Sequence, residues 1–143
     1  MMNDQANHYS MKCSEVDQML FVSGKSPFLS ITPKVYDFFT ERYEIASDVE
    51  IYHTDLSDDN AYGFTEVNGK EQFIQIHNDL NEEDYVTTVL HELVHVVQNE
   101  QGITADKVRE DQAYHMEKVL FKGWCASLQG VHNSPTDPQN RVY

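Results

Sequence analysis

Two histidines lie four residues apart at positions 91 and 95, and a glutamate, Glu92, directly follows the first. On an α-helix, residues with this spacing lie on the same face, so both imidazoles would point the same way and could share one zinc ion. Glu92 would lie beside the ion without being needed as a ligand, and it could take a proton from zinc-bound water. The pattern therefore predicts hydrolytic metal chemistry with His91 and His95 as ligands and Glu92 as the general base.

The residues around this motif are almost entirely apolar. Between Thr88 and Val97, Glu92 is the only residue with a formal charge. A helix buried over this stretch would remove two imidazoles and a carboxylate from water, at a cost of roughly 1–3 kcal/mol for each unsatisfied polar group. A metal ion with its water would satisfy all three. The alternative is that both histidines are ordinary helix-face residues paired with nearby acids.

A catalytic zinc ion usually has three protein ligands, and we expect the third from a second helix. The motif helix should end near Gly102, because glycine is favoured just past a helix C-terminus. A second helix should follow, with Thr104 as its N-cap, and should run to about Leu128. Helices joined by so short a loop pack as neighbours, so acids on the inner face of the second can reach the metal.

Four acids of the second helix compete for the third ligand position. Glu110 is preferred because it lies in the second turn, three residues before Ala113 on a face that should pack. Asp106 is the second choice, although the helix dipole favours an acid in the first turn without any metal. Glu117 shares the face of Glu110 and could instead accept a hydrogen bond from a ligand imidazole. Asp111 would then point elsewhere.

The run His91-Glu92-Leu93-Val94-His95, followed by Glu110 to Tyr114 on the next helix, resembles the smallest gluzincin metallopeptidases. The resemblance covers roughly residues 50–128. It implies that His91, His95 and Glu110 bind Zn²⁺, that Glu92 is the general base, and that a small sheet aligns the substrate along its edge strand. The gap between His95 and Glu110 is short for this family, and a related group uses an aspartate, so Asp106 remains the alternative.

Three segments before the motif largely alternate apolar and polar residues, as half-buried strands do: 49–54, 62–67 and 71–77. Asn68-Gly69 suits the turn of a β-hairpin between the last two. Upstream, Thr32 and Pro33 indicate a helix start with Thr32 as N-cap. These features predict an α+β, zincin-like fold: a small, antiparallel-rich sheet of about three strands, packed on the motif helix and the ligand-bearing helix after it.

A peptidase also needs a hydrogen-bond donor for the oxyanion that forms during hydrolysis. Tyr114, His115 and His132 are the candidates, because a phenol and an imidazolium can both donate to an oxyanion. Tyr114 is preferred as a second catalytic residue, since it lies one turn past Glu110 on the same face. The other histidines are expected at the surface or at strand ends: His8, His53 and His77.

The composition is that of one compact unit. The chain has 143 residues, of which 40% are hydrophobic and 11% aromatic, enough for one core. We expect a single metallopeptidase domain over residues 1–143, with loosely held segments at 1–12 and 130–143. Cys13 and Cys125 lack metal-ligand spacing, so two reduced thiols are expected, and a single disulfide is the alternative. Without a secretion signal or a run of eighteen apolar residues, a cytoplasmic protein that does not contact membranes is expected.

The net charge of −14 argues against a nucleic-acid partner, because a phosphate polyanion would be repelled. We therefore expect a protein or peptide substrate, hydrolysed by zinc-activated water. The alternative is a zinc-binding protein with a peptidase-like fold that acts by binding a partner protein. Glu92 favours the enzyme, because structural zinc is normally closed by four protein ligands and needs no glutamate beside them.

Overall fold

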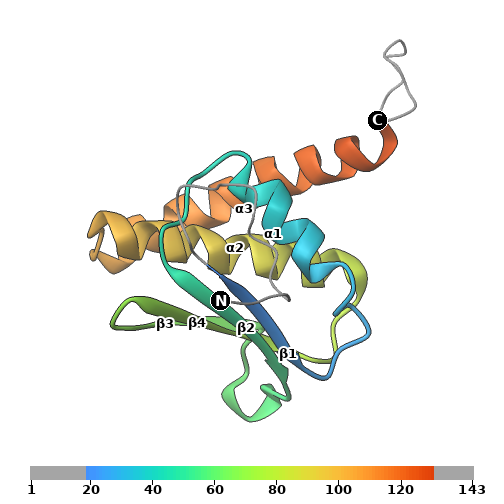
Figure 1. Ribbon diagram of the computed structural model, residues 1–143, viewed down its shortest axis with the longest axis horizontal. Coiled ribbons are helices and arrows are strands. Elements are labelled where there is room, and N and C mark those ends of the chain that lie inside the picture. The colour runs from blue at the N-terminus through green and yellow to red at the C-terminus, as the bar shows by residue number, and fades with distance from the viewer. Residues whose placement is uncertain (1–18, 131–143) are drawn as a thin grey trace, which may run out of the picture.

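A four-stranded mixed sheet forms one layer of the molecule (Figure 1). The computed structural model describes residues 19–130, so the segments expected to be loosely held lie outside the described residues, apart from Gly130. The strands lie side by side in the order β1-β2-β4-β3. Their bounds are Leu20–Gly24 for β1, Asp48–Thr54 for β2, Gly63–Asn68 for β3 and Glu71–His77 for β4, with a short 3-10 helix, η3 (Ser57–Asp59), between β2 and β3.

The sheet is larger and more parallel than the sequence predicted. β1 pairs with β2 in parallel, and β2 pairs with β4 in parallel. The expected hairpin is present, because β3 and β4 are antiparallel and turn at Gly69, whose φ of +65° suits glycine. The α+β class is confirmed, but the prediction of about three antiparallel-rich strands was wrong in detail. β1 has only five residues, and parallel pairing joins segments far apart in the chain, which local alternation cannot reveal.

Three helices lie on one side of the sheet (Figure 1). α1 (Thr32–Thr40) is the crossover that joins the parallel strands β1 and β2. α2 (Glu82–Gln101) carries the histidine motif and packs on β3 and β4, and α3 (Asp106–Gly130) lies along α2. α2 ends as predicted, since Gly102 is its C-cap with a φ of +77°. Among residues 19–130, no helix is both long enough and apolar enough to cross a membrane.

The core between the sheet and the helices makes α2 a rigid support for the motif. Residues 88–96 of α2 are buried without interruption. They pack in one cluster with the inward-facing residues of the central strands β2 and β4, namely Val49, Ile51, Ile74 and Ile76. Interiors of this kind are close-packed, so the motif side chains have little freedom to move.

His53 is the next-to-last residue of β2, which agrees with the expected strand-end position, but its side chain is buried. It shares the inward face of β2 with Val49, because alternate residues of a strand point the same way. Its Nδ1 donates to the carbonyl of Ser23 (2.8 Å), and its Nε2 lies 2.8 Å from the hydroxyl of Tyr85. Burial lowers the pKa of His53, and burial raises the pKa of Tyr85 to about 12.

Thr32 also differs from its prediction. Ile31 is the N-cap of α1 and makes no side-chain cap hydrogen bond, so Thr32 is the first residue inside the helix. Its hydroxyl donates to the carbonyl of Phe28 (2.9 Å) and contacts the hydroxyl of Tyr85. Thr32 therefore joins the buried polar group around His53 and Tyr85, where a side chain from α1 meets side chains from β2 and α2.

Candidate metal centre

α2 presents His91, Glu92 and His95 from its buried central turns. The helix begins where the side chain of Asn81 accepts a hydrogen bond from the backbone amide of Asp84, and three acids occupy its first turn. His91, Glu92 and His95 are 7%, 5% and 6% exposed. The helical spacing places the two imidazole rings 4.8 Å apart between their centroids. Three polar side chains thus meet at the point where α2 is most enclosed.

Glu110 of α3 faces both imidazoles. Its two carboxylate oxygens lie 3.3 Å from Nε2 of His91 and 3.2 Å from Nε2 of His95. A tetrahedral zinc ion with bonds of 2.0–2.1 Å would separate its ligand atoms by roughly 3.3 Å. One ligand atom from each of these three residues can be chosen so that all lie within 4.8 Å of one another. The three residues could therefore hold a metal ion of the size of zinc.

The other ring nitrogen of each histidine is already hydrogen-bonded. Nδ1 of His91 lies 2.7 Å from a carboxylate oxygen of Glu117, and Nδ1 of His95 lies 2.7 Å from Oε1 of Gln98. Both partner atoms accept hydrogen bonds, so both Nδ1 atoms donate and both Nε2 atoms keep a free lone pair toward Glu110. Glu117 thus makes the hydrogen bond that the sequence suggested for it.

Gln98 is itself held firmly. Its Nε2 donates to the carbonyl of Arg109 (3.1 Å) and to Oε1 of Gln112 (2.7 Å). A backbone carbonyl can only accept, so these bonds fix which end of the amide faces His95. Gln98 is 1% exposed, and its bonds tie α2 to α3 beside the site. The acceptor for His95 is therefore set by contacts between the two helices.

Glu92 faces β3 rather than α3. The hydroxyl of Thr65 donates to a carboxylate oxygen of Glu92 at 2.6 Å. Burial raises the pKa of Glu92, while the hydrogen bond from Thr65 and the neighbouring imidazoles act in the opposite direction. β3 can come this close because Gly63 has no side chain: a Cβ there would lie 2.9 Å from Cγ2 of Thr88 and 3.2 Å from Cγ of Glu92. The carboxylate is thus positioned by a separate element beside the two histidines that could hold a metal ion.

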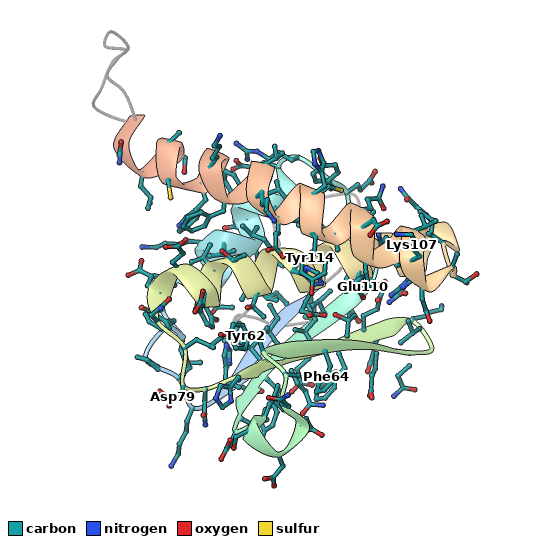
Figure 2. All side chains as sticks on the ribbon, turned by 180° about the vertical axis from the view of Figure 1, so that it is seen from behind. Tyr62, Phe64, Asp79, Lys107, Glu110 and Tyr114 are labelled. Atoms are coloured by element: carbon teal, nitrogen blue, oxygen red, sulfur yellow. The ribbon has the colours of Figure 1, made fainter. Side chains whose placement is uncertain are left out.

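A cleft of about 780 Å³ opens over these residues, between β3 and the helices α2 and α3. Figure 2 shows Glu110 and Tyr114 on α3 and Tyr62 near the start of β3. Tyr114 lines the cleft, is 54% exposed, and has its ring centroid 4.8 Å from that of His91. Its phenol is therefore accessible from the cleft, beside the residues that could hold a metal ion.

The other predicted candidates have different positions. Asp106 lines the cleft, but it is not part of the group with His91 and His95 that could hold a metal. Asp111 points outward and pairs with Lys107 (2.8 Å). His115 is exposed and does not line the cleft, and His132 lies outside the described residues.

Sequence reasoning missed two residues that hold the site in place. Gln98 lies three residues after His95, so helical spacing already put it on the same face and the signal was available. Thr65 gave no such signal, because it contacts Glu92 across 27 positions of the chain. Its role depends on which strand of the sheet lies against α2.

The fold and the site define a class of protein: a small α+β domain whose motif helix and following helix bring two histidines and a glutamate together. Residues 46–121 match the family model Peptidase_M78, the IrrE N-terminal-like domain. The chain therefore belongs to this zinc-peptidase-like family. The comparisons with curated proteins and with solved structures gave no match. The family span includes His91, Glu92, His95 and Glu110.

Proposed function

We propose that the protein is a zinc-dependent peptidase of the gluzincin type, with His91, His95 and Glu110 as metal ligands and Glu92 as the general base. The observation that carries this proposal is that the carboxylates of Glu110 and Glu92 face different partners. Glu110 faces both Nε2 atoms, whereas Glu92 is hydrogen-bonded to Thr65 on the strand side. A closed structural zinc site would use four protein ligands, and three surround this position among the described residues.

A zinc ion held there would act as a Lewis acid that acidifies water and polarises a peptide carbonyl. Glu92 takes the proton from the attacking water and passes it to the departing amine. The hydrogen bond from Thr65 holds the Glu92 carboxylate in place for this proton transfer. Tyr114 donates its phenolic hydrogen to the oxyanion, a role supported by its exposed position beside His91.

The edge strand of the sheet supports a peptide rather than a small molecule as substrate. β3 is an outer strand, and residues 60–65 line the cleft. An extended segment placed beside β3 could use its unpaired backbone groups, as in other cases of β-strand addition.

The test compares the wild type with Glu92→Gln for zinc content, by elemental analysis, and for cleavage of an unstructured protein, by mass spectrometry. We expect Glu92→Gln to keep about one zinc ion and to cleave roughly 10²–10⁴-fold more slowly, because a general base contributes on that scale. Glu66→Gln is the matched control, since Glu66 is exposed and neighbours Thr65 on the opposite face of β3. Unimpaired cleavage by Glu92→Gln, or a wild type without zinc, would contradict the proposal.

A further inference from the structure

The lining of the cleft is strongly acidic. Five carboxylates line it, from Asp84, Glu92, Asp106, Glu110 and Glu117. A single guanidinium and, when bound, a divalent metal ion do not balance this charge. The whole chain carries −14, so the surrounding surface does not reverse the field.

The guanidinium in the lining is already engaged. Nη1 of Arg109 donates to Oδ1 of Asn99 (2.8 Å) and to the carbonyl of Ile103 (2.9 Å). These bonds hold Arg109 against the loop between α2 and α3. Its single positive charge is outnumbered by the five carboxylates of the lining.

Two of the carboxylates have no role in the chemistry. Glu110 faces the ligand imidazoles, Glu92 is held by Thr65, and Glu117 accepts from His91. In residues 19–130, the carboxylates of Asp84 and Asp106 make no hydrogen bond or ion pair. Both line the cleft, so both remain available to a bound molecule.

These two carboxylates lie at opposite ends of the cleft. Asp84 precedes His91 by seven residues on α2, which is roughly 10 Å along a helix. Asp106 begins α3, one turn before Glu110, beside the part of α2 that carries Gln98. A peptide lying through the cleft would pass one carboxylate on each side of the metal ligands.

An exposed aromatic side chain also lines the end of the cleft near Asp84. Tyr62 directly precedes Gly63, which lies against Thr88 one turn past Asp84. Tyr62 lines the cleft and is 54% exposed, and Figure 2 shows it near the start of β3. A carboxylate beside an exposed aromatic ring suits Lys or Arg, because the ring face attracts a cation and the apolar stem can lie on it.

From the cleft and its two spare carboxylates, we infer that the protein selects substrate segments carrying Lys or Arg near the scissile bond, with Asp84 and Tyr62 forming the main cation-binding position. This inference names the substrate class of the proposed peptidase and rests on that function. Asp106 provides a second, weaker position on the other side. Acidic segments are repelled.

The first experiment measures binding separately from cleavage. Zinc-loaded Glu92→Gln protein is titrated with three short synthetic peptides that differ only in Lys, Ser or Glu on both sides of a central Ala-Ala bond. The Lys peptide should bind about tenfold more tightly than the Glu peptide, because an ion pair and a cation–π contact each strengthen binding by roughly two- to fivefold. Strong salt should reduce this difference.

Asp84→Asn, added to the same protein, should weaken the binding of the Lys peptide by roughly two- to fivefold. Asp79→Asn is the matched control: it makes the same change of charge at an exposed residue in the loop before α2 that does not line the cleft (Figure 2). Equal binding of the three peptides, or an equal effect of both substitutions, would overturn the inference.

Cleavage of the same peptides by the wild type then separates the two claims. If the Lys peptide binds most tightly but no peptide is cleaved, the proposed function is wrong and the inferred preference for Lys or Arg is kept. If all three peptides bind equally and are cleaved with the same kcat/KM, the proposed function is supported and the inferred preference for Lys or Arg is wrong. Faster cleavage of the Lys peptide, reduced by Asp84→Asn and unchanged by Asp79→Asn, would support both.

Discussion

At the scale of single residues, the two histidines of the site are supported by acceptors of different charge. His91 donates to the carboxylate of Glu117, and His95 donates to the neutral amide of Gln98. A carboxylate makes the imidazole a more basic ligand than an amide does, so His91 is expected to be the stronger of the two. Both partners fix the ring orientation that leaves Nε2 facing Glu110.

Replacing Gln98 with leucine should weaken zinc binding by about 10- to 100-fold, the usual effect of removing the partner of a ligand histidine. The side chain of His95 would lose its acceptor, and its ring could rotate or change tautomer. Affinity is measured by competition with a zinc-binding dye. Gln101→Leu, an exposed glutamine of the same helix, is the control. An unchanged affinity for Gln98→Leu would show that the hydrogen bond does not matter.

His53 should make the stability of the protein depend on pH. Burial lowers its pKa in the folded state, so the unfolded chain takes up a proton first as pH falls below about 6.5. The contribution of neutral His53 to the free energy of unfolding is present above that pH and is lost below it. The free energy of unfolding by urea, measured at pH 7.5 and at pH 5, should therefore fall less for His53→Gln than for the wild type. Parallel losses would contradict this account.

How much of the site could be predicted depends on whether the contacts are local. Helix geometry placed His91 and His95 on one face, and α2 has both Nε2 atoms beside Glu110. The burial of His53 was not predicted, although the strand alternation with Val49 indicated an inward position. Thr65 could not have been found, since its contact with Glu92 depends on the packing of β3 against α2.

At the scale of elements, the approach of β3 to α2 decides where Glu92 points. Gly63 allows this approach, because a Cβ there would lie 2.9 Å from Cγ2 of Thr88. The hairpin could be predicted from Asn68-Gly69, but the parallel neighbours of β2 could not, because β1 and β4 lie far from it in the chain. The strand beside the site was thus predictable and its position in the sheet was not.

Gly63→Ala should destabilise the protein by about 1–3 kcal/mol, as overpacking in a well-packed region does. Thr88→Ser removes the methyl group in the way, so the double variant should recover part of that loss. The carbonyl of Gln75, 3.1 Å from the same Cβ, would prevent full recovery. Urea unfolding of the four proteins in a double-mutant cycle measures the coupling. Strictly additive effects would mean that the two residues do not meet.

At the scale of the whole molecule, a metal ion would join α2 to α3. Its ligands come from both helices, His91 and His95 from one and Glu110 from the other. Only the folded chain brings these groups together, so metal binding would stabilise the fold through mass action. The sheet and α1 form the support on which the two helices are held.

Zinc at 100 times its dissociation constant should stabilise the protein by about 2.7 kcal/mol. For a chain of this size the Tm should rise on the order of 8 °C. Calorimetry with zinc and with a chelator measures the shift, and His91→Ala should show little of it. An equal rise in Tm for the wild type and His91→Ala would show that the metal binds elsewhere.

The most direct measurement is the anomalous diffraction signal of zinc in crystals of the zinc-loaded wild-type protein. We predict one strong peak at about 2.0–2.2 Å from Nε2 of His91, Nε2 of His95 and a carboxylate oxygen of Glu110, with Glu92 outside bonding distance. A peak bonded to Glu92 or to Asp106 in place of Glu110, or no peak between the two helices, would contradict it.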